Sequence, residues 1–481
     1  MQKGCVLALA VYAVLAVLFY AIAQEQLCTR TDDTDSVSAA ASVGEILPGT
    51  VLEQQFAVQS DRLTGFSVLC GTFGRENTGT LDLSLYELEG QGGRSLIGSY
   101  SLDVSQMQEN SWYDIPLDTP LGNAAGRSFL LKVSSADSAL GNAVTLYYGN
   151  SVSTGRIELA SEGWIPLYQN GQPVEGTLCL RTTGQTDLWF GRYYWYFAAG
   201  AGLLLGLYCW RLCAYEKKGK SCLGLRLIHA FTRYRFLIQQ LVSRDFKTKY
   251  KRSVLGIVWS FLNPLLTMLV QYVVFSTLFK SNILNFSVYL LTGIVLFNFF
   301  SESCGMGINS ILGNASLITK VYVPKYIYPV TRVLSSGINM LFSLVPLILV
   351  VLLTGTPVTP AILLLPFALA CLIGFCTGMV LILSSMMVFF RDTQFLWSVL
   401  SMIWMYATPI FYPESIIPAR FLVLYKLNPM YHFIRFARTV VMEGISPEPK
   451  AYLICLVFAV GAMVIGGLFF HKTQDKFVLH I

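Results

Sequence analysis

The sequence predicts a polytopic α-helical membrane protein. It has a six-helix core, preceded by two extra transmembrane helices that flank a jelly-roll-like, extracytoplasmic β-sandwich. The 481 residues are 54% hydrophobic and only 13% charged, whereas soluble domains carry about 25% charged residues. Apolar stretches near the ~20 residues needed to cross a bilayer recur along the chain. Basic residues cluster beside these stretches, which is typical of cytoplasmic segments. Topology therefore explains the net charge of +6, and we expect no nucleic-acid partner.

Residues 1–24 form the first predicted span, which is a transmembrane anchor or an uncleaved signal. The chain is apolar from residue 4 to residue 23, which is longer than the apolar part of a typical signal peptide. The end of this stretch, Ala21-Ile22-Ala23-Gln24, nevertheless resembles a signal-peptidase site. In either case, we expect the residues that follow to be exported.

Residues 25–187 are predicted to form the β-sandwich. Alternating apolar and polar residues, as in Thr80–Tyr86 and Ser128–Val133, predict half-buried strands, and many short strands indicate a sandwich or jelly roll. Cys70 and Cys179 either form a disulfide or are buried as free thiols. Carbohydrate binding is one possible role of the domain, and a spacer or a subunit contact are the alternatives. Four aromatic side chains either stack on sugar rings or fill the core and turns: Trp112, Tyr113, Trp164 and Tyr168.

Residues 188–213 form the second predicted span, and residues 214–253 are a basic segment expected on the cytoplasmic side. The span begins with a dense aromatic cluster, as is common at the membrane–water interface. From Phe231 to Tyr250, apolar residues recur mostly every three or four positions, with basic residues between them. This pattern predicts an amphipathic interface helix on the inner leaflet. The helix either meets a partner protein or only anchors to lipid headgroups.

Residues 254–481 are predicted to form the six-span core. Between the fifth and sixth spans, residues 413–449 are interrupted by Pro413, Pro418, Pro429 and Pro447, which indicates an external or re-entrant hairpin. The segment Leu312–Lys325 is amphipathic and polar enough to leave the membrane. The predicted spans are residues 254–279, 286–311, 326–353, 360–390, 393–411 and 451–470.

The six predicted core spans contain almost no ionisable residues, which argues against a proton-driven transporter. Glu302 and Arg332 are the exceptions, and they either pair with each other or face a cavity separately. A nucleotide-binding P-loop is absent, because Ala214 stands where the motif before Lys220 requires glycine. The sequence predicts no catalytic, cofactor-binding or metal-binding residue. Active transport would therefore draw its energy from a separate subunit.

Several motifs occur in an order that points to one family. Arg244–Tyr250 is followed by Trp259 and Asn263-Pro264, and Gly293 precedes Phe297–Phe300. Together these resemble the permease subunits of ABC polysaccharide exporters of the O-antigen and teichoic-acid type. Further matches to that family are its coupling helix and later landmarks, at Asn314–Pro324, Arg391-Asp392, Thr408–Ile410, Tyr412-Pro413 and Asn428-Pro429. The resemblance covers roughly residues 225–481 and leaves residues 1–213 without a counterpart.

The resemblance implies that the chain is a transport permease and not an enzyme. It implies a homodimer with two copies of a P-loop ABC ATPase that binds ATP and magnesium, while this chain binds no cofactor. The implied substrate is a lipid-linked glycan such as O-antigen or teichoic acid, and aromatic and polar walls rather than charges would suit it. The resemblance implies a location in the bacterial cytoplasmic membrane. The placement of the basic residues beside the spans, and not the resemblance, predicts that residues 25–187 lie outside and that the C-terminus lies inside.

The resemblance also assigns residues to four roles. The ATPase-coupling residues are Asn314, Ser316, Leu317, Ile318, Lys320, Val321 and Tyr322. The interface helix supplies Arg244, Asp245, Lys247, Lys249 and Tyr250. Because aromatic walls suit a glycan, the candidates for the translocation path are Trp259, Tyr272, Phe297, Phe300, Trp404 and Tyr406. The alternative is that these aromatic side chains face lipid or pack within the bundle. The external gate is expected at Thr408, Pro409, Tyr412, Pro413, Asn428 and Pro429.

Two other functions are compatible with the sequence. One is an ABC exporter of the same architecture that carries a drug or a lipid, and the β-sandwich counts modestly against it. The other is an integral-membrane glycosyl- or acyltransferase. Such an enzyme needs catalytic His, Asp or Glu at the membrane surface, and none of the four histidines stands in a recognisable acid–base pair.

Overall fold

The computed structural model divides the chain into two compact units, one made of strands and one of helices. The first unit is Cys28–Tyr193, and the second combines Met1–Leu27 with Tyr194–Ile481. The residues that the structure describes are 2–37, 39–88, 93–149, 167–219, 222–250, 255–256, 258–279, 285–321, 323–414 and 419–480.

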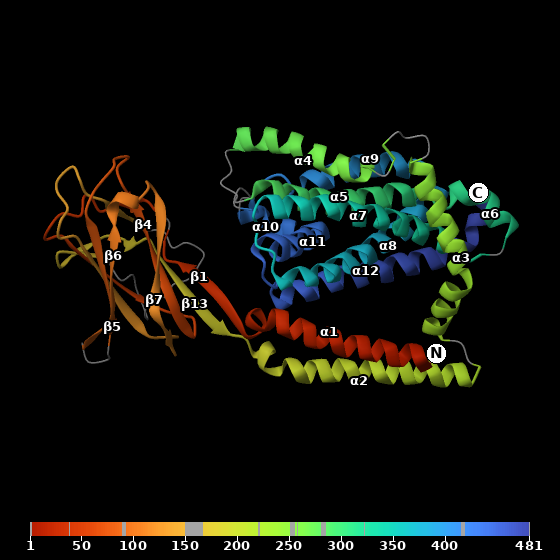
Figure 1. Ribbon diagram of the computed structural model, residues 1–481, viewed down its shortest axis with the longest axis horizontal. Helices are drawn as coiled ribbons and strands as arrows, with labels where there is room; N and C mark the ends of the chain where they lie inside the picture. Colours follow the sequence, from red (N-terminus) through yellow and green to blue (C-terminus); the bar gives the residue numbers. More distant parts are fainter. Residues whose placement is uncertain are drawn as a thin grey trace. The chain divides into compact units, whose positions relative to one another are not determined.

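The first unit is built from antiparallel strands in two sheets (Figure 1). One sheet has the order β1-β13-β4-β9-β12, with β2 paired to β9 and β7 paired to β4; the other has the order β11-β10-β3-β8-β5-β6. The strands are β1 (Thr29–Asp35), β2 (Ala41–Ser42), β3 (Val51–Ala57), β4 (Arg62–Gly71), β5 (Thr80–Leu88), β6 (Arg94–Asp103), β7 (Ser111–Gly122), β8 (Ser128–Ser134), β9 (Thr145–Gly149), β10 (Leu167–Gln169), β11 (Gln172–Val174), β12 (Thr177–Leu178) and β13 (Leu180–Asp187).

The two sheets share one hydrophobic core, so the predicted β-sandwich is confirmed. Leu81, Leu83 and Leu85 of β5 are fully buried and alternate with partly exposed residues, as the sequence pattern predicts. These side chains belong to the same cluster as Phe66 and Val68 of β4 in the other sheet. In each sheet, the apolar side chains face inward and form the core between the two layers, while the polar side chains alternate with them and face outward.

Cys70 and Cys179 are both free and buried. Cys70 belongs to the core between the sheets, whereas Cys179 packs with Val37 and Leu69 in a separate small cluster. Burial raises the pKa of the Cys70 thiol to about 12, because a thiolate is poorly solvated there. Of the two alternatives, the structure has the buried free thiols.

The second unit is a bundle of long helices with short helices at its ends (Figure 1). The helices of the chain are α1 (Gln2–Cys28), α2 (Trp189–Lys217), α3 (Leu223–Tyr250), α4 (Val258–Phe279), α5 (Phe286–Ile308), α6 (Ala315–Lys320), α7 (Ile327–Leu353), α8 (Leu365–Phe389), α9 (Thr393–Tyr406), α10 (Ala419–Lys426), α11 (Pro429–Arg438), α12 (Pro449–Thr473) and α13 (Phe477–His480). Shorter 3-10 turns include η2 (Leu312–Asn314) and η3 (Pro360–Leu364), and η5 (Thr439–Glu443) is a π-helix.

Seven helices of the described residues are long and apolar enough to cross a membrane: α1, α2, α4, α5, α7, α8 with η3, and α12. The sequence led us to expect eight. The difference is α9, which has 14 residues and is therefore about 21 Å long, short of the ~30 Å hydrocarbon thickness of a bilayer. The chain leaves the helix at Ala407, so residues 407–413 continue without regular structure.

The core of the helical unit is closed by very tight packing of α8 against α12, which run side by side (Figure 1). A Cβ atom at Gly466 of α12 would lie 2.2 Å from the carbonyl oxygen of Gly378 in α8. Only glycine permits this approach, and small residues at helix contacts are a common means of packing in membranes.

The two N-terminal helices, α1 and α2, also lie side by side (Figure 1). The hydroxyl of Tyr12 donates to the carbonyl of Ala198 at 2.7 Å, and the hydroxyl of Tyr194 donates to the carbonyl of Ala16 at 2.8 Å. Phe19 of α1 then packs edge-on against Tyr452 of α12, with ring centroids 5.1 Å apart. Helix α1 therefore contacts the core bundle at α12, and α2 is hydrogen-bonded to α1.

Candidate functional site

The amphipathic helix α3 runs across one end of the bundle, which also carries α6 (Figure 1). Its apolar face is partly buried, and Ile238 and Leu241 join a cluster with Ile311, Ile327 and Tyr328. The helical periodicity in the sequence produces this contact, because residues three and four apart share a helix face. We call this end of the bundle the α3 end.

A buried carboxylate fixes the position of α3. The Asp245 side chain is 4% exposed, and its Oδ1 lies 2.9 Å from Nη1 of Arg332 in α7. Arg244 is 3.3 Å from the same oxygen, and the hydroxyl of Ser335 donates to Oδ2 at 3.3 Å. Two cations and a hydroxyl therefore compensate the loss of water around this charge, as a buried carboxylate requires.

The same cluster reaches the segment that leads into α6. Nη2 of Arg244 donates to Oδ1 of Asn314 at 3.3 Å, and Nδ2 of Asn314 donates to the carbonyl of Ser310 at 2.8 Å. Asn314 is buried and immediately precedes α6. Asp245, Arg244, Arg332 and Asn314 thus connect α3, α7 and the start of α6, and we call them the Asp245 cluster.

A second ion pair joins α3 to the bundle. Nζ of Lys249 lies 2.7 Å from Oε1 of Glu302 in α5, and Nδ2 of Asn339 in α7 donates to the same oxygen at 2.8 Å. Glu302 and Arg332 therefore do not form the pair that was one expectation: each binds a residue of α3 instead. Both satisfy their charges near the end of a span, which is far less costly than leaving a charge at mid-bilayer.

Helix α6 presents a mostly exposed surface at the α3 end. Leu317 is 37% exposed, and Ser316, Lys320 and Val321 are exposed as well. Ile318 turns inward and packs on the cluster that contains Ile238. Tyr322 lies outside the described residues. An exposed short helix with an apolar side chain at its centre is suited to insertion into a partner's groove.

The opposite end of the bundle carries the predicted gate residues, and Asn428 connects them. The indole Nε1 of Trp404 donates to Oδ1 of Asn428 at 2.7 Å, and Nδ2 of Asn428 donates to Oγ1 of Thr408 at 2.8 Å. Asn428 also caps α11, since its Oδ1 accepts from the backbone N–H of Met430 at 3.0 Å. Pro429 occupies the first position of α11, where a helix needs no backbone N–H donor and the fixed φ of proline fits.

Tyr412 is held from two sides in the same region. Its hydroxyl donates to the carbonyl of Tyr406 at 2.8 Å and lies 3.0 Å from the hydroxyl of Tyr425. Its own carbonyl accepts from the hydroxyl of Tyr289 at 2.8 Å. Thr408 and Pro409 are buried, and Pro413 is half-buried. We call residues 408–412 the gate segment.

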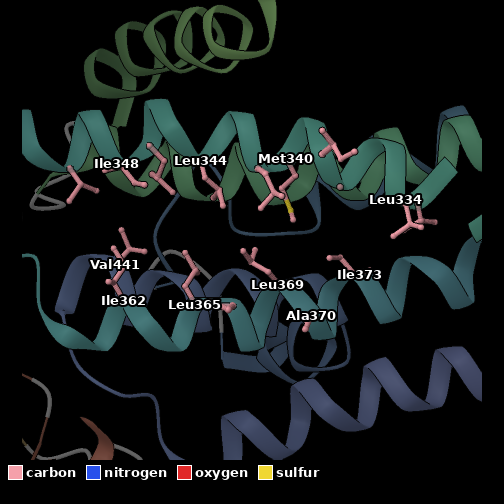
Figure 2. Close-up of a pocket in the computed structure, with 17 residues that line it drawn as sticks. Leu334, Met340, Leu344, Ile348, Ile362, Leu365, Leu369, Ala370, Ile373 and Val441 are labelled. Carbon is pink, nitrogen blue, oxygen red and sulfur yellow. The ribbon is translucent and has the colours of Figure 1, made fainter. Parts of the chain in front are cut away.

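Two grooves of different chemistry lie in the helical unit. One, of about 720 Å³, combines aromatic and polar side chains beside the gate segment, including Trp404, Tyr412, Tyr425 and Asn428. The other, of about 610 Å³, lies between α7 and α8 and is lined by side chains such as Leu344, Ile348 and Leu369 (Figure 2). The second groove offers a sugar almost no hydrogen-bonding group, whereas the first offers both aromatic faces and polar atoms.

Comparison with known proteins places this arrangement in a family. Residues 236–442 match the model of the ABC-2 type transporter family. The O-antigen export system permease protein RfbA of Myxococcus xanthus is 32% identical over 257 residues, which cover 53% of this chain and 98% of that protein. The chain belongs to the ABC-2 type transporter family. The resemblance to polysaccharide export permeases is thereby confirmed.

Other relatives of the permease point the same way. A Klebsiella pneumoniae protein of the same description is 29% identical over 243 residues. This aligned region covers 50% of this chain and 93% of that protein. The polysialic acid transport protein KpsM of Escherichia coli is 23% identical and covers 50% of this chain and 95% of its own length. The family match starts within α3, so α1, the β-sandwich and α2 lie outside it. Membership makes the chain a multi-pass transport permease, not an enzyme, and implies an ABC ATPase partner.

The six aromatic residues expected along the path differ in how exposed they are in the permease. Trp259, Tyr272 and Tyr406 are exposed, and Trp404 is half-buried beside the gate segment. Phe297 and Phe300 are buried in the core of a single chain, where Phe300 contacts Phe375, Trp397 and Trp404. Phe297 and Phe300 therefore pack inside the bundle, because most residues of α5 are buried by neighbouring helices.

The interface-helix residues Arg244, Asp245 and Lys249 make the ion pairs described above, and Lys247 is exposed. Tyr250 ends α3, and nothing is described of its side chain. The sequence singled out Arg332 but not its pairing with Asp245. Ser335, Asn339 and the buried Arg438 were not predicted as functional residues. The sequence does contain a weak signal for these residues, because a charged or polar residue within an apolar span needs a partner.

Proposed function

We propose that this permease is the transmembrane subunit of an ATP-driven exporter of a lipid-linked polysaccharide across the bacterial cytoplasmic membrane. The Asp245 cluster is the observation that carries the proposal, because it joins α3 and α7 to the start of the exposed α6. A partner that pulls on α6 or α3 would move α7 with them. The relatives named for O-antigen and polysialic acid export support a glycan as the substrate.

The proposed assembly is a homodimer with two ATPase subunits, which bind ATP and magnesium on their own P-loops. The ATPases dock on α6 and α3 at the cytoplasmic side. The permease copies meet along α4 and α9, whose exposed apolar side chains include Val273, Val399 and Ile403. Trp259, Tyr272, Trp404 and Tyr406 then lie on or near this seam. Residues 25–187 face outward, and the gate segment is the external gate.

Replacing Leu317 with aspartate tests the coupling role of α6. A charge at the centre of the docking helix is expected to block insertion into an apolar groove, and we expect ATP-dependent export to fall by about 100-fold, the effect of losing roughly 2.7 kcal/mol of binding. Polysaccharide on the outside and ATPase co-purification are measured with the permease and its P-loop ATPase in membranes. Leu317→Met is the matched control and should retain both activities.

If ATPase assembly and export are unchanged in Leu317→Asp, α6 is not the docking helix.

The substrate class has its own test in the same membranes. A drug or a free lipid that is exported with ATP while the lipid-linked glycan is not would support the alternative exporter with the same architecture.

We further propose that the β-sandwich binds the exported glycan on the outer face of its six-stranded sheet. Register places one row of side chains across that face, in the order Tyr168, Glu53, Lys132, Ser84 and Ser99. Tyr168 is 38% exposed. An aromatic face beside hydroxyl, amine and carboxylate groups is the combination that recognises sugars.

The other aromatic candidates are less available. Trp112 lies under the guanidinium of Arg181 at 4.4 Å and packs with Val37 and Leu69. The Tyr113 ring packs on the core of the sandwich. Trp164 lies outside the described residues. Tyr168 is therefore the aromatic side chain on which this proposal rests.

Tyr168→Ala is expected to weaken glycan binding by the purified full-length permease. Losing one stacked ring corresponds to about a tenfold increase in Kd, or roughly 1.4 kcal/mol. Calorimetric titration with the soluble polysaccharide measures the effect. Leu140→Ala, which changes an exposed side chain elsewhere in the same unit, should bind as the parent does. If Tyr168→Ala and the parent bind the polysaccharide with equal affinity, this face of the sheet is not the glycan-binding site.

A further inference from the structure

Arg438 is a buried cation at the end of α11 that the functions above leave unexplained. The residue is 8% exposed. Among the described residues, no carboxylate lies within ion-pair distance of its guanidinium, although other arginines of the chain have such partners. Charged side chains are seldom buried without a specific partner. The guanidinium must therefore bind something other than an acid.

The partners of Arg438 are backbone carbonyls of two separate segments. Its Nη1 donates to the carbonyl of Pro409 at 2.7 Å, and its Nη2 donates to the carbonyls of Ile410 at 3.1 Å and Tyr289 at 3.2 Å. The guanidinium carbon also lies 3.3 Å from the centroid of the Tyr289 ring. One side chain thus joins the gate segment to α5 and α11.

These carbonyls need a donor because the gate segment has left the helix. Helix α9 ends at Tyr406, so the carbonyls of Pro409 and Ile410 belong to no helical ladder. Both residues are buried, and a buried carbonyl without a donor is unfavourable. The planar fork of arginine supplies several charge-assisted donors at once, which lysine does not.

Two neighbours on α5 shape the place that Arg438 occupies. The hydroxyl of Tyr289 donates to the carbonyl of Tyr412, so it holds the far end of the gate segment. A Cβ atom at Gly293 would lie 3.0 Å from Nη2 of Arg438 and 3.0 Å from Cγ2 of Ile410. Any larger residue at position 293 would therefore push the cation or the gate segment away. A glycine here is what lets both approach α5.

We infer that Arg438 is a positioning residue that holds the gate segment closed against α5 and α11. Three hydrogen bonds and the contact with Tyr289 fix residues 409 and 410 to these helices. The gate segment then opens when α11 moves with it, or when the guanidinium releases the carbonyls. This inference rests on the proposed role of residues 408–412 as the external gate.

The test measures how accessible the gate segment is in the full-length permease. Phe411 is buried beside the two bonded carbonyls, and Phe411→Cys provides a thiol there for a membrane-impermeant maleimide added from outside. Labelling is counted above that of the chain without this thiol. Adding Arg438→Met should raise the labelling rate about tenfold, because local opening is no longer opposed by the guanidinium. Adding Arg438→Lys should give an intermediate rate, since lysine donates but lacks the fork.

The matched control is Arg435→Met. It removes an arginine one turn earlier on the same helix, where the side chain is 60% exposed and lies 3.7 Å from Glu414. Labelling within about twofold of the parent is expected. An Arg438→Met rate equal to the parent's, or an Arg435→Met rate equal to that of Arg438→Met, would overturn the inference.

A second variant keeps the test decisive if Arg438→Met does not fold. Tyr289→Phe retains the ring under the guanidinium but removes the hydroxyl that donates to Tyr412. It should raise the labelling of the introduced thiol in the Phe411→Cys background, and unchanged labelling in both Tyr289→Phe and Arg438→Lys would again contradict the inference. The labelling needs no substrate and no ATPase, so it is separate from the proposed export. Leu317→Asp should lower export as predicted above and leave labelling unchanged.

Discussion

Asp245→Asn is expected to separate ATP hydrolysis from export. The substitution keeps the shape of the side chain but removes the charge that Arg332 and Arg244 share at 2.9 Å and 3.3 Å. Removing one partner of a buried ion pair leaves the other uncompensated and costs about 3 to 5 kcal/mol. The link between α3 and α7 is then lost, while the exposed surface of α6 stays intact. We expect the ATPase to bind and hydrolyse ATP with export reduced at least tenfold, or about 1.4 kcal/mol.

The measurement is the amount of polysaccharide exported per ATP hydrolysed in reconstituted membranes. Arg235→Gln is the control, because it neutralises an exposed charge on the same helix outside the Asp245 cluster. A double-mutant cycle with Arg332→Gln gives the coupling between the two positions directly, and the combined effect should be smaller than the sum of the single effects. Additive losses, or full export by Asp245→Asn, would show that the ion pair does not transmit the motion.

The fold was largely predictable from patterns with a strong physical cause. Alternation in segments such as Thr80–Tyr86 predicts strands, because only side chains on one face of a sheet reach the core. The long apolar stretches predict spans, because unpaired backbone groups are not tolerated in lipid. The exception, α9, was predicted too long. Residues 407–411 are apolar enough to extend a span, but hydrogen bonds from Asn428 and Tyr289 hold them outside the helix.

The candidate site was predictable only in part. The motif around Asn314 placed α6, and the periodicity before Tyr250 placed α3. The partner of each charge was not predictable. Glu302 and Arg332 looked like a pair, since both are isolated in apolar spans, yet each binds a residue of α3. Contacts between residues far apart in sequence depend on how helices cross, and periodicity does not specify the crossing.

Gly466→Leu is expected to have the largest effect on stability. A Cβ atom at this position of α12 would lie 2.2 Å from the carbonyl oxygen of Gly378 in α8 and 2.9 Å from its Cα. These are backbone atoms of a neighbouring helix, so no side-chain rotation relieves the overlap and the two helices must separate. Overpacking in a core costs about 1 to 3 kcal/mol when only side chains adjust. A clash between backbones exceeds that range, and we expect the purified permease to unfold at a markedly lower temperature or to fail to accumulate.

Gly467 provides a control one residue further along the same helix. A Cβ atom at Gly467 meets no heavy atom within 4 Å, so Gly467→Leu adds the same side chain at a site that faces open space. Replacing glycine in a helix with leucine is favourable by helix propensity, by up to about 1 kcal/mol. Gly467→Leu should therefore be as stable as the parent or slightly more so, as measured by thermal unfolding in detergent. Equal stability of the two leucine variants would mean that α8 and α12 do not meet at Gly378 and Gly466.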